Sequence, residues 1–214
     1  MPSKLIKSTL GFGLIALHFV VLGLAYYSWG TIYGWWPHTA YDLFPLLGLL
    51  AFSLMWIHYV AAAVNRFYHS AFNLKKYFAY TGYAVLALII LHPGILIYSL
   101  WRDGFGLPPG SYLNYVGKTS EAAVLFGTAA WVIFITYEFV NRLKHMRFWP
   151  VMVGLNDVAM GLIFFHARKL GTSQNLHWFH LLWMFYGLVL ILCIAQRLYF
   201  IYQRKHRSST PVSS

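Results

Sequence analysis

The chain has 214 residues, of which 59% are hydrophobic, 20% aromatic and only 10% charged, and its formal net charge is +11. About 25% of the residues in a soluble domain are charged, so this composition excludes a soluble protein and indicates an all-α integral membrane protein. The single cysteine, Cys193, excludes a disulfide framework and a thiolate metal cluster.

Six stretches are apolar over the ~20 residues that a helix needs to cross a bilayer of roughly 30 Å. In chain order they cover residues 10–29, 43–64, 77–100, 122–140, 148–165 and 177–202. They form one transmembrane domain, residues 1–202. Residues 203–214 form a basic, Ser-rich tail that we expect to be disordered. The predicted architecture is a six-helix membrane bundle.

The Lys and Arg residues are distributed unevenly between the two sides of this bundle. Twelve of the 16 fall on the side of the N-terminus, within residues 1–9, 65–76, 141–147 and 197–207. The other side has the remaining four, Arg102, Lys118, Arg168 and Lys169. The positive-inside rule therefore predicts a multi-pass protein of the cell membrane with both termini in the cytoplasm. Attraction to anionic lipid heads accounts for the excess charge, and we expect no nucleic acid partner.

Two histidines on different spans have similar predicted depths. At 1.5 Å per residue, His92 lies about 22 Å and His166 about 26 Å from the inner face. Two imidazoles on facing helices are the protein ligands of a bis-histidine haem. Pro93 should kink its helix and free a backbone carbonyl. Small residues that would admit a porphyrin, or close helix packing, occur on the same two spans: Gly82, Gly94, Gly154 and Gly161.

Three further residues belong to this outer half. His177 and His180 open the last span and share one helix face; they are interfacial residues, contacts of a haem propionate, or an alternative source of the ligand. Arg168 follows His166 and is an interface anchor or the cation that a propionate would need.

A second polar layer lies in the inner half of the predicted bundle. His18, His58 and Asp157 fall at about 12, 9 and 12 Å from the inner face. Ionisable side chains at such depth usually face the bundle interior and have a partner. Three interpretations remain open: an inner haem held by His18 and His58, a quinone or proton site using His58 and Asp157, and a structural hydrogen-bonded layer.

Three segments resemble a known family: Lys75 to Tyr98 with Leu91-His92-Pro93-Gly94, Trp131 to Arg142, and Phe148-Trp149 followed by Phe165-His166. They are similar to the ferric-reductase-like transmembrane domain and, within it, to the small haem-binding membrane subunits of bacterial methionine sulfoxide reductase systems. The resemblance implies an oxidoreductase subunit of a bacterial inner membrane, with haem b between the third and fifth spans. It implies that His92 and His166 are the iron ligands. The chain departs from the family pattern where an inner haem would be held, because Val153 and Phe78 occupy those positions.

The sequence thus predicts a membrane protein with one or two haems b that relays electrons to an acceptor at the outer face. The donor would be a quinol or a separate protein that carries flavin. One alternative is a small proton-coupled transporter whose pathway is lined by His58, Asp157 and His92. Another is a membrane scaffold without a cofactor.

Overall fold

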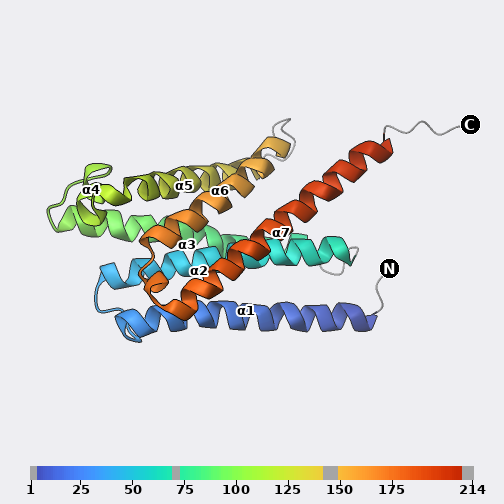
Figure 1. The fold of residues 1–214 in the computed structure, drawn as a ribbon, viewed down its shortest axis with the longest axis horizontal. Helices are drawn as coiled ribbons and strands as arrows, with labels where there is room; N and C mark the ends of the chain where they lie inside the picture. Colours follow the sequence, from blue (N-terminus) through green and yellow to red (C-terminus); the bar gives the residue numbers. More distant parts are fainter. Residues whose placement is uncertain (1–3, 69–72, 142–148, 209–214) are drawn as a thin grey trace, which may run out of the picture.

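The computed structural model describes residues 4–68, 73–141 and 149–208, and all its regular structure in these ranges is helical. The long helices are α1 (Lys4–Tyr33), α2 (Ala40–Phe67), α3 (Leu74–Arg102), α5 (Glu121–Asn141), α6 (Trp149–Leu170) and α7 (His177–Ser208). Within the described residues, six helices are long and apolar enough to cross a membrane. The prediction of an all-α chain with six apolar spans is therefore confirmed (Figure 1).

The helices extend beyond the predicted apolar stretches. The beginning of α2 is fixed by a capping box, in which the Thr39 hydroxyl accepts from the backbone N–H of Asp42 and the Asp42 carboxylate accepts from that of Thr39. At the other end of the chain, α7 continues to Ser208. The expectation of disorder over 203–214 is therefore wrong for residues 203–208, and residues 209–214 lie outside the described part.

Short helical segments occupy two of the connections. Between α3 and α5 lie α4 (Gly110–Val116) and the 3₁₀ turn η1 (Lys118–Ser120), and between α6 and α7 lies η2 (Thr172–Asn175). No helix is assigned to either connection from the sequence. The connector 142–148, including Phe148 of the predicted fifth span, lies outside the described residues.

Two helix hairpins, α2 with α3 and α5 with α6, are the main packing units of the bundle. The most extensive helix contacts join α2 to α3 and α5 to α6, and α3 touches α5. Helix α1 packs on α2, and α7 crosses α2 obliquely (Figure 1). This arrangement places α2 at the centre, in contact with α1, α3 and α7.

Large aromatic side chains dominate the interior. Trp29, Phe52, Phe179 and Trp183 are each at most 1% exposed. By contrast, large apolar side chains cover the lateral surface, as with Phe12 and Phe19 at 71% and 77% exposure and their counterparts on α3, α5, α6 and α7. Such an outward-facing apolar surface is expected only where lipid replaces water.

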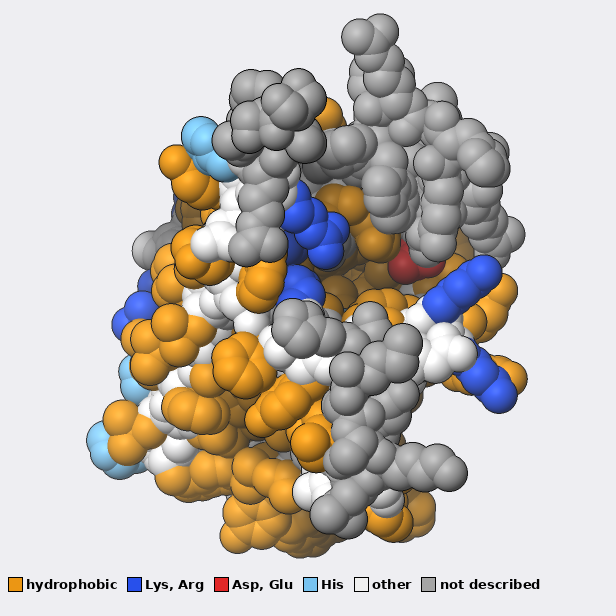
Figure 2. All heavy atoms as spheres, turned by 90° about the vertical axis from the view of Figure 1, so that its right-hand side faces the viewer, with side chains coloured by type: hydrophobic (Ala, Val, Ile, Leu, Met, Phe, Trp, Pro, Cys, Tyr) orange, Lys and Arg blue, Asp and Glu red, His pale blue; other side chains and the backbone are white. Residues whose placement is uncertain are grey.

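The start of α1 and the end of α7 lie at the same end of the bundle (Figure 1), as six crossings require. Figure 2 looks onto this end and shows Lys and Arg side chains around it, with hydrophobic side chains over the flanks. The ends of α2, α3 and α7 bring basic residues there, among them Arg66, Lys76 and Arg204. That this end faces the cytoplasm stays a prediction from the charge distribution.

Candidate metal centre

His92 is held by the neighbouring helix of its own hairpin. It lies on α3, half-buried, and its Nδ1 donates to the backbone carbonyl of Phe44 on α2 at 2.7 Å. The ring rests on Gly48, since a Cβ at that glycine would lie 2.8 Å from the Cε1 of His92. Because a carbonyl only accepts, Nδ1 carries the hydrogen and Nε2 of the neutral ring carries a lone pair.

His166 is held in the same way in the second hairpin. It lies on α6, and its Nδ1 donates to the backbone carbonyl of Ala123 on α5 at 2.8 Å. The ring rests on Gly127, where a Cβ would lie 2.6 Å from the Cε1 of His166. This neutral ring also presents Nε2 as its free acceptor.

The two arrangements share one local geometry. In each, the carbonyl and the glycine are four residues apart on the first helix of the hairpin, and the histidine comes from the second helix. Residues four apart share a helix face, so a ring that lies on the glycine is in position to reach the carbonyl one turn earlier. Among the described residues no hydrogen bond reaches Nε2 of His92 or His166.

The two hairpins are joined beside His92. Pro93 has no N–H, so the carbonyl four residues earlier, that of Ile89, lacks its helical donor. Nε1 of Trp131 on α5 donates to this carbonyl at 2.8 Å. The prediction that Pro93 frees a carbonyl is consistent with this bond, which ties α5 to α3 one turn from His92.

The depth argument did not identify the residues on which the two imidazoles rest. Gly48 and Gly127 were missed, although each is a single glycine inside an apolar helix, where it costs about 1 kcal/mol relative to alanine. That cost is the sequence signal for a packing role. By comparison, a Cβ at Gly82, Gly94, Gly154 or Gly161 would meet no heavy atom within 4 Å. These four glycines have open space beside them, and their admission of a porphyrin stays a prediction.

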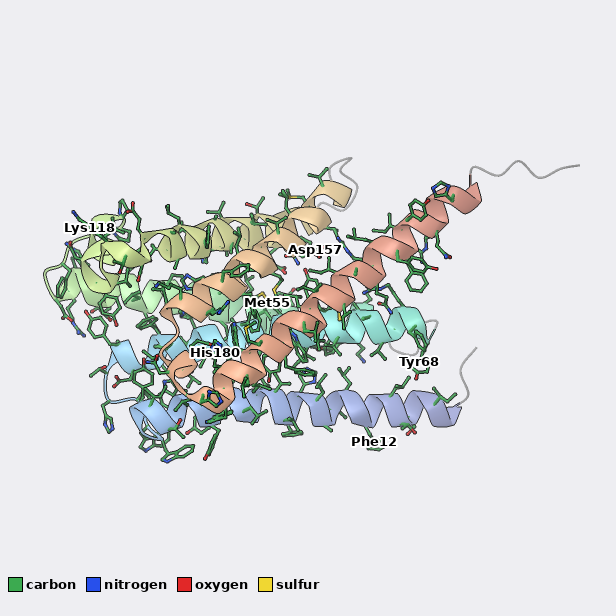
Figure 3. The ribbon with its side chains drawn as sticks, viewed as in Figure 1. Phe12, Met55, Tyr68, Lys118, Asp157 and His180 are labelled. Atoms are coloured by element: carbon green, nitrogen blue, oxygen red, sulfur yellow. The ribbon has the colours of Figure 1, made fainter. Side chains whose placement is uncertain are left out.

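The other outer candidates differ in their exposure. His177 and Arg168 are exposed and His180 is half-buried. Within the described residues no hydrogen bond or ring contact joins either of these histidines to His92 or His166. Figure 3 shows His180 near the start of α7.

The inner polar layer divides into two networks. In the first, Nδ1 of His18 donates to the Leu14 carbonyl at 2.7 Å, and the Tyr77 hydroxyl lies 3.0 Å from its Nε2. The Thr81 hydroxyl donates to the Tyr77 carbonyl, so Nε2 of His58 donates to Thr81 at 2.7 Å. Both Nε2 atoms are therefore engaged with protein groups, and Nδ1 of His58 keeps its lone pair.

The second network holds Asp157. The Tyr59 hydroxyl donates to Oδ1 of Asp157 at 2.8 Å, and Arg197 on α7 pairs with Oδ2. His58 and Tyr59 are adjacent on α2 and point in different directions, which places His58 and Asp157 in separate networks. Of the three interpretations of this layer, the hydrogen bonds favour the structural one.

The histidine pair suits one class of metal site in particular. In the described ranges, no three His, Cys, Asp or Glu side chains gather as ligands of a bare metal ion. A haem iron takes four ligands from its porphyrin and needs only two axial ones from the protein. Two imidazoles with anchored Nδ1–H groups and free Nε2 atoms fit that requirement.

Comparisons with known proteins give no match to this chain. No model of a known protein family matches the chain, and no curated protein and no solved structure matches it.

Proposed function

We propose that this protein binds haem b through Nε2 of His92 and of His166 and acts as an electron-transfer protein of the membrane. The observation that carries the proposal is the paired geometry of the two rings. Each Nδ1–H is anchored on a backbone carbonyl, at 2.7 and 2.8 Å, which leaves the ligand nitrogen free. An anchored Nδ1–H fixes the tautomer and the ring orientation of a metal-ligating histidine and raises its basicity.

The surroundings of the two rings fit such a role. The haem would supply one-electron chemistry. The protein holds both imidazoles on helices, which orient them more rigidly than loops do, and surrounds them with apolar side chains and lipid. Arg168, two residues beyond His166 and exposed, offers a cation for a propionate at the outer end.

The donor we propose is a quinol from the bilayer or a flavin on a separate protein, and the acceptor lies at the outer face. Of the inner candidates, His58 is the better proton acceptor. Its Nδ1 keeps a lone pair, whereas Asp157 already pairs with Arg197 and accepts from Tyr59. An inner haem on His18 and His58 would first have to break the bonds of both Nε2 atoms.

The transporter alternative receives less support from the geometry. It needs His58, Asp157 and His92 along one pathway, but these side chains belong to three separate hydrogen-bond networks. No observation favours it over electron transfer.

A reduced-minus-oxidised absorption spectrum of the purified protein tests the proposal. We expect a low-spin b-type signal in the wild type and its loss in both His92→Ala and His166→Ala, because a bis-imidazole site fails when either ligand is lost. His38→Ala removes an exposed histidine of the connection between α1 and α2 and is the matched control. A wild type without haem, or low-spin haem retained in both ligand variants, would refute the assignment.

A further inference from the structure

Two pairs of backbone groups in this protein form the same surface for an imidazole ring. One pair is the Phe44 carbonyl with Gly48 on α2, and the other is the Ala123 carbonyl with Gly127 on α5. We call each pair a carbonyl–glycine cradle. The sequences around the two glycines, Leu-Leu-Gly-Leu-Leu and Leu-Phe-Gly-Thr-Ala, share little else, so what repeats is the geometry.

Each cradle acts on the ring in two ways. The glycine allows the ring to lie directly on the helix backbone, since a Cβ would come within 2.8 Å of the His92 ring and 2.6 Å of the His166 ring. Carbon atoms in contact normally stay about 3.5 Å or more apart, so any side chain at these positions must push the ring away. The carbonyl accepts the Nδ1–H and has a second lone pair for its helical donor, so the ring is oriented without opening the helix.

We propose that the two cradles are imidazole-binding sites in their own right, which position the ring whether or not the chain carries it. Gly48 and Gly127 are then positioning residues for the two metal ligands. This inference rests on the proposed haem function. According to this inference, the backbone of α2 and of α5 determines where each Nε2 points. The helices that carry the histidines, α3 and α6, do not.

The proposal predicts that a free imidazole can replace a missing side chain. In His92→Gly and in His166→Gly, added 4-methylimidazole should enter the vacated cradle and restore the low-spin spectrum. It has the shape of the histidine side chain and keeps the N–H that reaches the carbonyl. By contrast, 1-methylimidazole has the same number of atoms but no N–H, and the loss of that hydrogen bond should weaken its apparent affinity roughly tenfold or more.

Glycine variants test the second half of each cradle. With both histidines in place, Gly48→Ala and Gly127→Ala should shift the haem toward high spin, because the displaced ring no longer directs Nε2 at the metal. In the His→Gly backgrounds the same alanines should abolish rescue by 4-methylimidazole. Gly13→Ala and Gly23→Ala on α1 are the matched controls, because a Cβ there meets no heavy atom within 4 Å and neither glycine lies on a helix that carries or supports the two histidines. They should leave spin state and rescue unchanged.

The outcomes separate this inference from the proposed function. If the wild type carries no haem, the proposed function fails. If the wild type carries low-spin haem but Gly48→Ala and Gly127→Ala keep its spectrum and its rescue, the cradles are overturned and the function stands. Equal rescue by the two methylimidazoles would overturn the carbonyl half of the argument. If Gly48→Ala prevents the otherwise wild-type chain from folding, the comparison of the two methylimidazoles in His92→Gly still tests whether the cradle binds an imidazole.

Discussion

Replacing Trp131 by phenylalanine would remove the one side-chain donor that the described residues offer to the Ile89 carbonyl. That carbonyl has no helical partner, because Pro93 lacks an N–H, and its bond from the indole measures 2.8 Å. A polar group left unpaired away from water costs about 1–3 kcal/mol. Since Trp131 is 38% exposed, we expect Trp131→Phe to lower the free energy of unfolding by about 1–2 kcal/mol.

Pro93→Ala provides the companion variant. Alanine restores an N–H at position 93 that can donate to the Ile89 carbonyl, so the indole bond becomes dispensable. In that background Trp131→Phe should lose only packing, and the coupling in a double-mutant cycle should be about 1 kcal/mol.

The measurement is reversible unfolding in mixed detergent micelles, followed by far-ultraviolet circular dichroism so that the loss of a tryptophan does not disturb the signal. Trp101→Phe is the matched control, because Trp101 is 58% exposed at the end of α3 and makes no hydrogen bond through its indole within the described residues. If the two changes are additive within about 0.5 kcal/mol, the indole does not replace the missing helical bond and the reasoning is wrong.

Three further predictions concern the other polar groups of the spans. Asp157→Leu should lower the free energy of unfolding by about 3 kcal/mol because it leaves Arg197 without its counter-charge, and Arg197→Met in the same chain should recover much of that loss in the same micelle assay. His180→Ala should keep the low-spin absorption spectrum, and a high-spin shift would show that α7 and not α6 supplies the second ligand. If His58 takes the proton from a quinol, His58→Ala should slow haem reduction by a short-chain quinol in stopped-flow measurements while Asp157→Asn leaves it nearly unchanged; equal rates in the wild type and both variants would rule out both acceptors.

The number and order of the spans could be read from the sequence because hydropathy and length report directly on bilayer crossing. The helix ends could not, since they depend on local hydrogen bonds. The capping box of Thr39 and Asp42 begins α2 three residues before the predicted stretch, and the last helix continues beyond its apolar part to Ser208.

The candidate site, like the helices, could be predicted from the sequence only in part. Depth along a helix follows from counting residues, and the sequence placed His92 and His166 at similar depths in the outer half. Lateral neighbours do not follow from depth. The supporting roles of Gly48 and Gly127 depend on which helices pair, and the separation of His58 from Asp157 depends on the direction in which each residue of α2 points.

The ion pair between Asp157 and Arg197 has a consequence for how the chain enters the bilayer. Helix α6 is the least apolar of the six spans and carries the carboxylate, while its counter-charge lies 40 residues later on α7. A lone carboxylate near the centre of an inserting helix costs about 2.5–3.5 kcal/mol. During synthesis, α6 reaches the insertion machinery before α7 has left the ribosome. At that stage its carboxylate has no counter-charge, so α6 alone has only a marginal affinity for lipid. The last span thus completes the membrane partitioning of the one before it, and the two should leave the translocon as a unit.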